Sequence, residues 1–444
     1  MNPGSLVRGG HVLTLEEPGH IADGAVRVAG GVIDAVGDWQ DLRARYPDDE
    51  VSGGPHDIVT PGFINTHGHF SEALIVGLAK ELTLWEWVGA LINPVAPHLD
   101  EESAYVGTLL AGIQMLKTGV TLVNDMFVCD PQSKAATPGV VRALDELGLR
   151  GVVSFGAGDV RGARVDAILR EHDALAAAAA ASKLSRFRVG IAAVGAQSDE
   201  LFAESVRWSV GHGSHIHLQE IREEVTASRS RHGATPISHC ARSGLFAAPT
   251  IAAHCVWADR NDREILLAND VGVAHNPVSN MILASGVCPV IEMRQLGIAV
   301  GIGVDGPASN DRQDMLEAIK TTVLLQRVDK LQATAFSAQE ALDMATIGGA
   351  RALGMETEVG SLRPGKKADL VVFDGDDPAL ANVYDPFAAV VYSAGPGQIK
   401  DVWVGGDRPV IAGRVVNVDE SEVAARSRPL SRALVAKAGV ARDR

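Results

Sequence analysis

The stretch Thr60-Pro61-Gly62-Phe63-Ile64-Asn65-Thr66-His67-Gly68-His69 is an apolar run that ends in two histidines separated by one residue. We interpret the run as a β-strand, in which residues i and i+2 point to the same side. His67 and His69 can therefore reach one metal ion from the end of a single strand. A histidine pair by itself is weak evidence for a metal site, so other segments must supply further ligands.

Short apolar runs of this kind alternate with longer segments of helical periodicity across the middle of the chain. Eight such runs over roughly 300 residues predict an α/β fold with a (β/α)8 TIM-like barrel. A doubly wound sheet would alternate in the same way, but no glycine-rich dinucleotide turn follows the first run. The predicted strands are residues 58–65, 121–125, 151–155, 188–193, 215–218, 250–254, 272–275 and 300–304.

The two ends of the chain have a different pattern. Short apolar runs are broken there by glycine pairs such as Gly30-Gly31 and Gly405-Gly406, which is typical of β-hairpins. We therefore predict a small β-sandwich domain built from both termini, namely residues 1–58 together with 359–418. The barrel is predicted to comprise residues 59–358, and residues 419–444 a C-terminal helical tail.

Further polar candidates lie at the ends of later apolar runs, and the carboxyl ends of barrel strands converge on one face. His217 is followed by Glu220, a spacing that lets the imidazole bind metal while the carboxylate carries protons. His215 belongs to the same His-x-His pair, and we interpret it as a wall of the site. His254 is expected to stabilise the reacting oxygen. Asp305 is expected to bind metal and to accept a proton from the attacking water, although an Asp at this place could also cap a helix.

Together these residues predict one divalent metal held by three imidazoles and a carboxylate, which is equipment for hydrolysis. The predicted ligands are His67, His69, His217 and Asp305, and the predicted catalytic residues are Glu220, His254 and Asp305. Several residues that follow or face these segments are candidates for contacts with a substrate. They are Trp87, Glu72, Phe127, His275 and Asn310. Packing in the core is the equal alternative for Trp87, Glu72 and Phe127, and a structural role is favoured slightly for His275.

The composition narrows the class of partner. The 444 residues are 46% hydrophobic and 21% charged, with a formal net charge of −15, which argues against nucleic acid or an anionic membrane as a partner. No apolar segment reaches the ~18 residues that span a bilayer, and the N-terminus has no signal-peptide pattern. Four widely spaced cysteines without a CxxC pair are expected to be reduced thiols. We expect a cytoplasmic protein that acts on a small molecule.

The motifs resemble those of the amidohydrolase superfamily, in its branch of cytosine-deaminase-like aminohydrolases and triazine chlorohydrolases. The resemblance runs nearly the full length of the chain, and among that branch it is greatest to deaminases of adenosine, methylthioadenosine and S-adenosylhomocysteine. The segments that carry it are Pro61 to His69, His217-Leu218-Gln219-Glu220, Ala253-His254-Cys255, His275-Asn276-Pro277-Val278-Ser279-Asn280 and Gly303 to Asp311.

The resemblance implies one Zn²⁺ or Fe²⁺ on the four predicted ligands, with Glu220 and His254 handling protons. It also implies a homo-oligomer, a dimer or tetramer. Two departures affect the substrate. The nucleoside deaminases carry a glutamate for the ribose hydroxyls where this chain has Ala96, and a histidine where it has Val194. An apolar residue cannot accept the hydrogen bonds of a diol.

We therefore predict deamination of a free heterocycle, such as a purine-, pterin-, pyrimidine- or triazine-like base, with release of ammonia. Two alternatives stay open within hydrolysis. One is a chlorohydrolase acting on a chloro-triazine-like ring, and the other is a nucleoside deaminase of the adenosine or S-adenosylhomocysteine type. Ring-opening amide hydrolysis is a weaker alternative, because no carboxylated-lysine site with two metals is evident. A binding protein that has lost catalysis is disfavoured, since every ligand position is filled.

Overall fold

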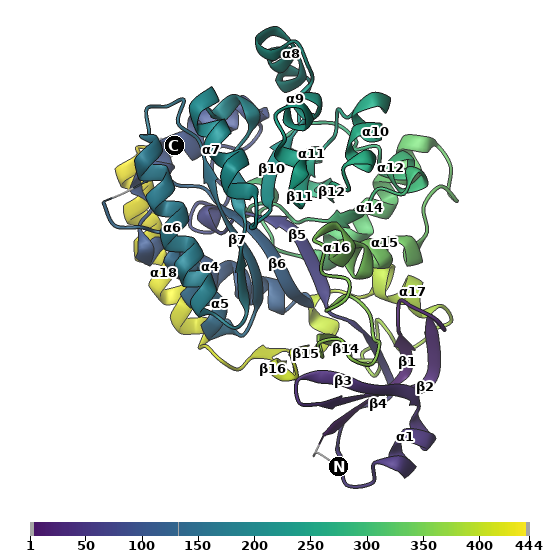
Figure 1. Cartoon of the computed structure of the whole chain (residues 1–444). Coiled ribbons are helices and arrows are strands. Elements are labelled where there is room, and N and C mark those ends of the chain that lie inside the picture. The colour runs from purple at the N-terminus through teal and green to yellow at the C-terminus, as the bar shows by residue number, and fades with distance from the viewer. Residues whose placement is uncertain (1–3, 132, 441–444) are drawn as a thin grey trace.

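The computed structural model describes residues 4–131 and 133–440. Residues 1–3 of the predicted β-domain and 441–444 of the predicted tail lie outside the described residues. Figure 1 shows a barrel surrounded by helices, and a second sheet in which the purple N-terminal strands lie beside the yellow-green strands from the other end of the chain. This arrangement confirms the predicted α/β barrel with a separate β-unit built from both termini.

The barrel is closed by eight parallel strands. Each strand pairs with its neighbour, and the ring closes where Ile302 of the last strand pairs with Asn65 of the first. The strands of the ring, in order, are β5 (Phe63–Gly68), β6 (Val120–Phe127), β7 (Arg150–Ala157), β9 (Val189–Ile191), β10 (Ser214–Leu218), β11 (Thr250–His254), β12 (Gly272–His275) and β13 (Val300–Ile302). A short strand, β8 (Ser185–Phe187), pairs with the first part of β7, on the same edge on which β9 pairs with its last part.

Helices cover the outside of this ring (Figure 1). They include α4 (Glu101–Leu116), α5 (Pro138–Leu147), α6 (Val165–Ala181), α7 (Asp199–Ser209), α10 (Arg260–Ala268), α12 (Val290–Leu296), α14 (Met315–Lys330), α15 (Ala338–Ala345) and α16 (Ile347–Ala352). Local sequence signals explain where they begin and end. For example, α5 starts with Pro138 and ends at Gly148, whose φ of +70° suits glycine.

Shorter helices lie on the face at the carboxyl ends of the strands and in the connections between units. They are α2 (Leu84–Trp87), α3 (Asn93–Val95), α8 (Arg222–His232), α9 (Pro236–Arg242), α11 (Pro277–Ile282), α13 (Pro307–Asn310) and α17 (Pro386–Ala388). The helix α18 (Glu420–Ala438) falls within the predicted tail and runs along α4 (Figure 1). None of the helices within the described part of the chain is long and apolar enough to cross a membrane.

The second sheet has eight strands and mixes both directions of pairing. Its order is β17 (Arg414–Val415), β16 (Asp407–Ile411), β15 (Ile399–Val404), β14 (Leu370–Phe373), β4 (Glu50–Pro61), β1 (Ser5–Leu13), β2 (His20–Ala29) and β3 (Val32–Asp38). The short helix α1 (Trp39–Arg45) follows β3. The pairing of β4 with β14 joins the N-terminal and C-terminal halves of the sheet.

The structure differs from the sequence prediction at the entry to the barrel. The predicted strand 58–65 is two strands, because β4 ends at Pro61 and β5 begins at Phe63. Between them, a Cβ atom on Gly62 would lie only 2.1 Å from Oγ1 of Thr121. The glycine therefore lets the chain turn closely past β6 as it leaves one sheet and enters the other.

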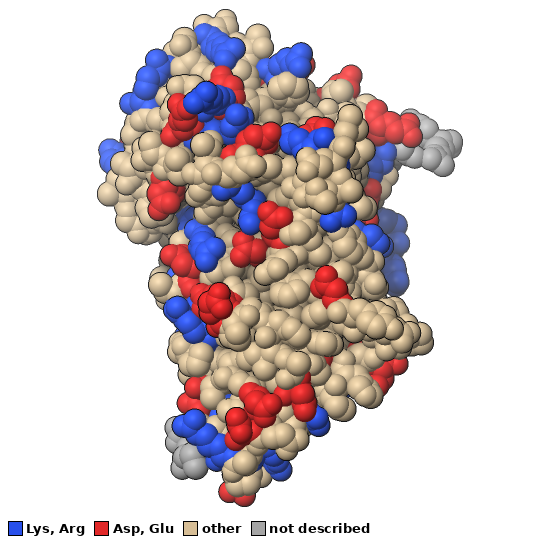
Figure 2. Space-filling view, turned by 90° about the vertical axis from the view of Figure 1, so that its right-hand side faces the viewer, with Lys and Arg blue, Asp and Glu red and all other residues tan. Residues whose placement is uncertain are grey.

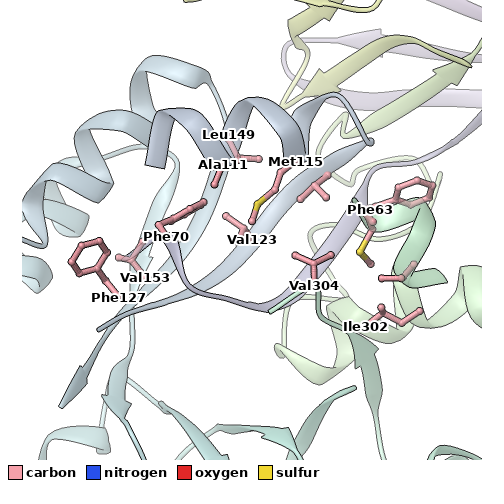
Figure 3. Packing of buried hydrophobic residues seen from close by; sticks show 14 of the residues in the cluster. Phe63, Phe70, Ala111, Met115, Val123, Phe127, Leu149, Val153, Ile302 and Val304 are labelled. Atoms are coloured by element: carbon pink, nitrogen blue, oxygen red, sulfur yellow. The ribbon is translucent and has the colours of Figure 1, made fainter. Parts of the chain in front are cut away.

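The core lies between the barrel strands and the surrounding helices. Figure 3 shows Phe63 and Phe70, from either end of β5, packed with Met115 of α4 and Val123 of β6. All of these side chains are at most 1% exposed. This packing holds the C-terminal end of β5 against its neighbours, which is the end that carries His67 and His69.

The surface carries both kinds of charge. On the face drawn in Figure 2, lysine and arginine side chains are interspersed with aspartate and glutamate, and they form no single basic face. Over the whole chain acidic residues outnumber basic ones, which gives the formal net charge of −15.

Candidate metal centre

The predicted ligands and proton carriers are brought together at the carboxyl ends of four barrel strands. His67 lies in β5 with His69 just after it, His217 lies in β10, and His254 ends β11. Asp305 follows β13 and donates its backbone N–H to the carbonyl of His67 at 3.0 Å. The segments are far apart in sequence, and the closed barrel is what makes them neighbours.

The side-chain atoms of this group lie within a few ångströms of one another. Nε2 of His69 is 3.1 Å from Nε2 of His217. Oδ1 of Asp305 is 3.2 Å from Nε2 of His67 and 3.3 Å from Nε2 of His69. Two sets of residues have ligand atoms close enough to share an ion, namely His67 with His69 and His217, and His67 with His254 and Asp305.

The backbone fixes the tautomers of two imidazoles. Nδ1 of His69 lies 2.6 Å from the carbonyl of Met126, and Nδ1 of His217 lies 2.7 Å from the carbonyl of Ala192. A carbonyl can only accept, so Nδ1 carries the proton in both rings. Their Nε2 atoms are then unprotonated, and two lone pairs approach each other at 3.1 Å.

A relay of side chains fixes the third imidazole. Ser154 donates its hydroxyl proton to the carbonyl of Asp125 at 2.8 Å, so its Oγ accepts from Nδ1 of His215 at 3.2 Å. Nε2 of His215 is thereby the acceptor for Nδ1–H of His67 at 2.8 Å. Asn124 Nδ2 is almost equally distant from both nitrogens of His215, at 3.2 and 3.3 Å, so it lies along neither lone pair. The relay leaves Nε2 of His67 unprotonated.

This arrangement fits a divalent metal. Zinc–nitrogen bonds of 2.0–2.1 Å in tetrahedral geometry separate neighbouring ligand atoms by roughly 3.3 Å, which is close to the distances between these atoms. Nε2 of His67 is buried and, among the described residues, has no hydrogen-bond partner. The facing lone pairs of His69 and His217 and the unpartnered Nε2 of His67 are unfavourable unless they share a cation. By their chemistry, these three histidines and Asp305 therefore suit a metal.

The electrostatics favour the forms that bind metal. Burial lowers the pKa of His67 to about 3, and burial followed by the neighbouring imidazoles lowers the pKa of His217 well below its usual range. Burial acts to raise the pKa of Asp305, but the surrounding imidazoles, His67 first among them, outweigh it and lower that pKa. Neutral imidazoles and an ionised carboxylate are the states that bind a metal.

The predicted proton carriers lie beside the ligands. Nε2 of His254 is 3.5 Å from Oε2 of Glu220 and 4.0 Å from Oδ2 of Asp305. Nδ1 of His254 lies 2.9 Å from the amide oxygen of Asn280, which orients the ring. Ser285 donates its hydroxyl to Oε1 of Glu220 at 3.1 Å. Burial raises the pKa of Glu220, which suits a group that takes up and releases protons.

The backbone is strained where these residues sit. His254 and Asp305 have φ values of +72° and +60°, and Gln219, next to Glu220, has +53°. Residues with a Cβ atom rarely adopt this left-handed region, and such strain gathers at functional sites. The strand ends therefore turn sharply at the residues that carry the chemistry.

A cavity of about 860 Å³ opens over the centre, a size typical of ligand-binding sites. Its wall includes His69, His217, Glu220, His254 and Asp305. Of the residues predicted to contact a substrate, Glu72 and Trp87 line the cavity. The other three are not part of its wall. Phe127 packs in the core (Figure 3), His275 is fully buried, and Asn310 donates its amide to the carbonyl of Val304 at 2.6 Å.

The cavity also contains residues that sequence reasoning missed. Glu224 and the polar pair Asp130–Arg161 were not predicted, although Glu224 stands only four residues after Glu220. Ser285, which binds Glu220 from outside the cavity wall, was not predicted either. Two residues that were singled out for the substrate argument are placed differently. Val194 lines the cavity, whereas Ala96 is 1% exposed and is not part of its wall.

Known proteins resemble this chain over nearly its whole length. The chain is 36% identical over 439 residues to a 5-methylthioadenosine/S-adenosylhomocysteine deaminase of Pelotomaculum thermopropionicum, covering 97% of this chain and 98% of the relative. It is 37% identical over 382 residues to a 5'-deoxyadenosine deaminase of Methanopyrus kandleri, covering 85% and 86%. The crystal structure of a zinc-bound adenosine deaminase from Xanthomonas campestris superposes with a TM-score of 0.90 at 28% identity, covering 98% and 99%.

Family models agree with these relatives. Residues 24–48 match a bacterial imidazolonepropionase-like composite domain. Residues 58–408 match the amidohydrolase family, a range that includes all the strands of the barrel and all the predicted metal ligands. The chain therefore belongs to the amidohydrolase family.

Proposed function

We propose that this chain is a metal-dependent aminohydrolase that removes ammonia from an amino-substituted N-heterocycle, and that its substrate is a free base. Family membership makes the chain a hydrolase of carbon–nitrogen bonds other than peptide bonds. One observation carries the proposal for the reaction. A set of unprotonated imidazoles and a carboxylate lies in the wall of the cavity, with Glu220 and His254 3.5 Å apart beside it.

The proposed cofactor is one Zn²⁺ or Fe²⁺, held by His67, His69, His217 and Asp305. When bound, the metal would act as a Lewis acid that makes water a stronger nucleophile near neutral pH. Zn²⁺ and Fe²⁺ both suit imidazole and carboxylate ligands. The zinc-bound relative from Xanthomonas campestris supports Zn²⁺.

Each remaining step belongs to a side chain of this protein. Asp305 accepts a proton from the attacking water. Glu220 gives its proton to the ring nitrogen next to the carbon that bears the amino group. Asp305 then passes the proton that it took from water to the departing amine, and Glu220 regains a proton from the added hydroxyl as the new carbonyl forms. Burial acts to lower the pKa of His254, but the charges of Glu220 and Asp305 outweigh it and raise that pKa. The protonated ring, oriented by Asn280, then donates a hydrogen bond from Nε2 to the oxygen that develops negative charge. Cavity walls of Leu84, Trp87 and Val88 exclude water from the ring.

The preference for a free base rests on two positions. Val194 lines the cavity where nucleoside deaminases of this group have a histidine, and no carboxylate can be supplied from position 96, where alanine is buried. A ribose needs acceptors for two hydroxyls, and leaving them unpaired in a cavity is costly.

A second candidate is a nucleoside deaminase of the adenosine type. The two curated relatives act on adenine nucleosides by name, and the cavity of about 860 Å³ has room for more than one ring. The carboxylate of Asp130 and the amide of Asn93 also lie in the cavity wall, where they could accept hydrogen bonds from hydroxyls.

The test is ammonia release by the metal-replete protein on matched pairs of free base and nucleoside, together with pterins and triazines. Ammonia from free bases, with the matched nucleosides inert, would support the proposal. Turnover of nucleosides but not of their bases would overturn the choice of substrate and leave the reaction intact. Chloride release from a chlorotriazine, with no ammonia from any compound, would overturn the reaction itself.

A further inference from the structure

A second buried carboxyl group lies next to the proton carrier. Glu224 is the third residue of α8 and is 7% exposed. Its Oε2 accepts the backbone N–H of Glu220 at 2.9 Å. The residue before α8 is Ile221, which has no side-chain oxygen to cap the helix. One of the two oxygens of Glu224 therefore has a structural task, because it holds the backbone of Glu220 just before the helix begins.

The other oxygen has no such task. Oε1 of Glu224 is buried and, within the described part of the chain, makes no hydrogen bond. The side chain is part of the cavity wall. A buried carboxyl oxygen without a partner is unfavourable, so its position is explained best by a partner that arrives with the ligand. Oε1 itself has almost no accessible surface, so the carboxyl group must turn toward the cavity to meet that partner.

The rest of the cavity wall favours a partner that donates hydrogen bonds. Glu72 also lines the cavity, with one oxygen accepting the backbone N–H of Ala308 at 3.0 Å. The two arginines in the wall are already paired, Arg161 with Asp130 at 2.6 Å and Arg231 with Asp199 at 2.8 Å. Carboxyl groups near the centre and neutralised cations farther out disfavour an anionic ring and favour a ring rich in N–H groups.

We propose that Glu224 is a substrate-binding residue that accepts a hydrogen bond from a second amino group of the heterocycle. The preferred substrates are then rings with at least two amino groups, one that leaves and one that Glu224 binds. This inference rests on the proposed function and deepens it by naming a substrate class. Burial and the charge of Glu220 raise the pKa of Glu224 to about 7, so a donor from the ligand would favour its ionised form.

The variant Glu224→Gln separates the two tasks of this side chain. The carboxamide oxygen can still accept the N–H of Glu220, so this structural hydrogen bond is kept. The amide nitrogen then stands where Oε1 stood and can only donate. The matched control is Glu200→Gln, which makes the same change in charge on the exposed side of α7.

The experiment measures Kd by calorimetry at pH 8 for three purines that share a 6-amino group and differ at C2. They are 2,6-diaminopurine, adenine and 6-amino-2-oxopurine. We expect wild type and Glu200→Gln to bind the diamino ring about 10- to 100-fold more tightly than adenine, as for one hydrogen bond to a charged group. In Glu224→Gln this preference should vanish, and the 2-oxo ring should become the better ligand.

Two results would overturn the inference. One is a wild type that binds the three rings equally or binds none of them, which decides the question even if the variant does not fold. The other is an unchanged preference in a folded Glu224→Gln. Failure of the proposed function can be distinguished from failure of this inference, because ammonia release is measured in parallel with binding. Binding that depends on Glu224 without ammonia would overturn deamination, and ammonia without any preference at C2 would overturn the role of Glu224.

Discussion

The Nε2 atoms of His69 and His217 face each other at 3.1 Å, each with its proton committed to a backbone carbonyl through Nδ1. Two lone pairs in this relation repel unless a cation lies between them. The pair therefore ties the carboxyl ends of β5 and β10 to the presence of a metal.

Replacing Glu220 by Gln should remove the proton carrier and leave the metal site intact. We expect kcat to fall by at least about 100-fold, the usual contribution of a general acid–base group. Metal content, measured by plasma mass spectrometry, should stay near one equivalent. The control is Glu200→Gln, and a Glu220→Gln protein with near-normal turnover would remove Glu220 from the mechanism.

The relay from Ser154 through His215 to His67 should set the metal affinity. In His215→Phe the Nδ1–H of His67 loses its acceptor, so the ring is free to hold the wrong tautomer. We expect the dissociation constant for Zn²⁺ to rise about 10- to 100-fold, measured by competition with a chelator. His212→Phe, at an exposed histidine of the preceding turn, should bind Zn²⁺ like wild type. Equal affinities in both variants would contradict the relay.

Replacing Gly306 by Ala should weaken substrate binding, because the added Cβ atom would displace Glu72. A Cβ atom there would lie 1.8 Å from Oε2 of Glu72, so that carboxylate would have to move and give up the N–H of Ala308. The end of a flexible side chain can shift, so we expect a loss of stability of only about 1 kcal/mol, but a clear rise in KM for the ring. Gly89→Ala is the control, because nothing lies within 4 Å of its added Cβ. An unchanged KM would show that Glu72 does not contact the substrate.

The raised pKa of Glu224 predicts a pH dependence of stability. The group keeps its proton in the folded state up to about pH 7, whereas the unfolded chain loses it near pH 4.5. The free energy of unfolding should therefore fall as pH rises from 4.5 to 7, by up to about 3 kcal/mol from this group. Glu224→Gln removes this dependence, so denaturant unfolding of the metal-free protein should show the variant gaining on wild type between pH 5 and pH 8. A constant difference would contradict the raised pKa.

The sequence predicted the barrel and the approach of its ligands for a simple physical reason. Apolar periodicity marks the strands, and parallel strands must deliver their carboxyl ends to one face, so His67, His217 and Asp305 had to meet there. Apolar periodicity does not show how closely one strand approaches the residues of its neighbour. The break at Gly62 was missed for this reason. It appears only once Thr121 of the neighbouring strand is placed beside the glycine.

The sequence also could not predict contacts that depend on the direction in which a side chain points. Phe127 and Asn310 follow ligand segments just as Glu72 does, yet Phe127 packs in the core and Asn310 binds the backbone carbonyl of Val304. Glu224 was missed because a glutamate in the first turn of a helix is usually a simple cap. Its open oxygen is visible only after the cavity is known.

The most direct test of the account is a metal titration with ammonia release as the readout. Protein stripped of metal by a chelator is mixed with increasing Zn²⁺ and assayed on the most active ring. We predict no ammonia without metal, a linear rise to one equivalent, and a plateau beyond it. Full activity in the stripped protein, or no ammonia at any ratio on any ring, would contradict metal-dependent deamination at this centre.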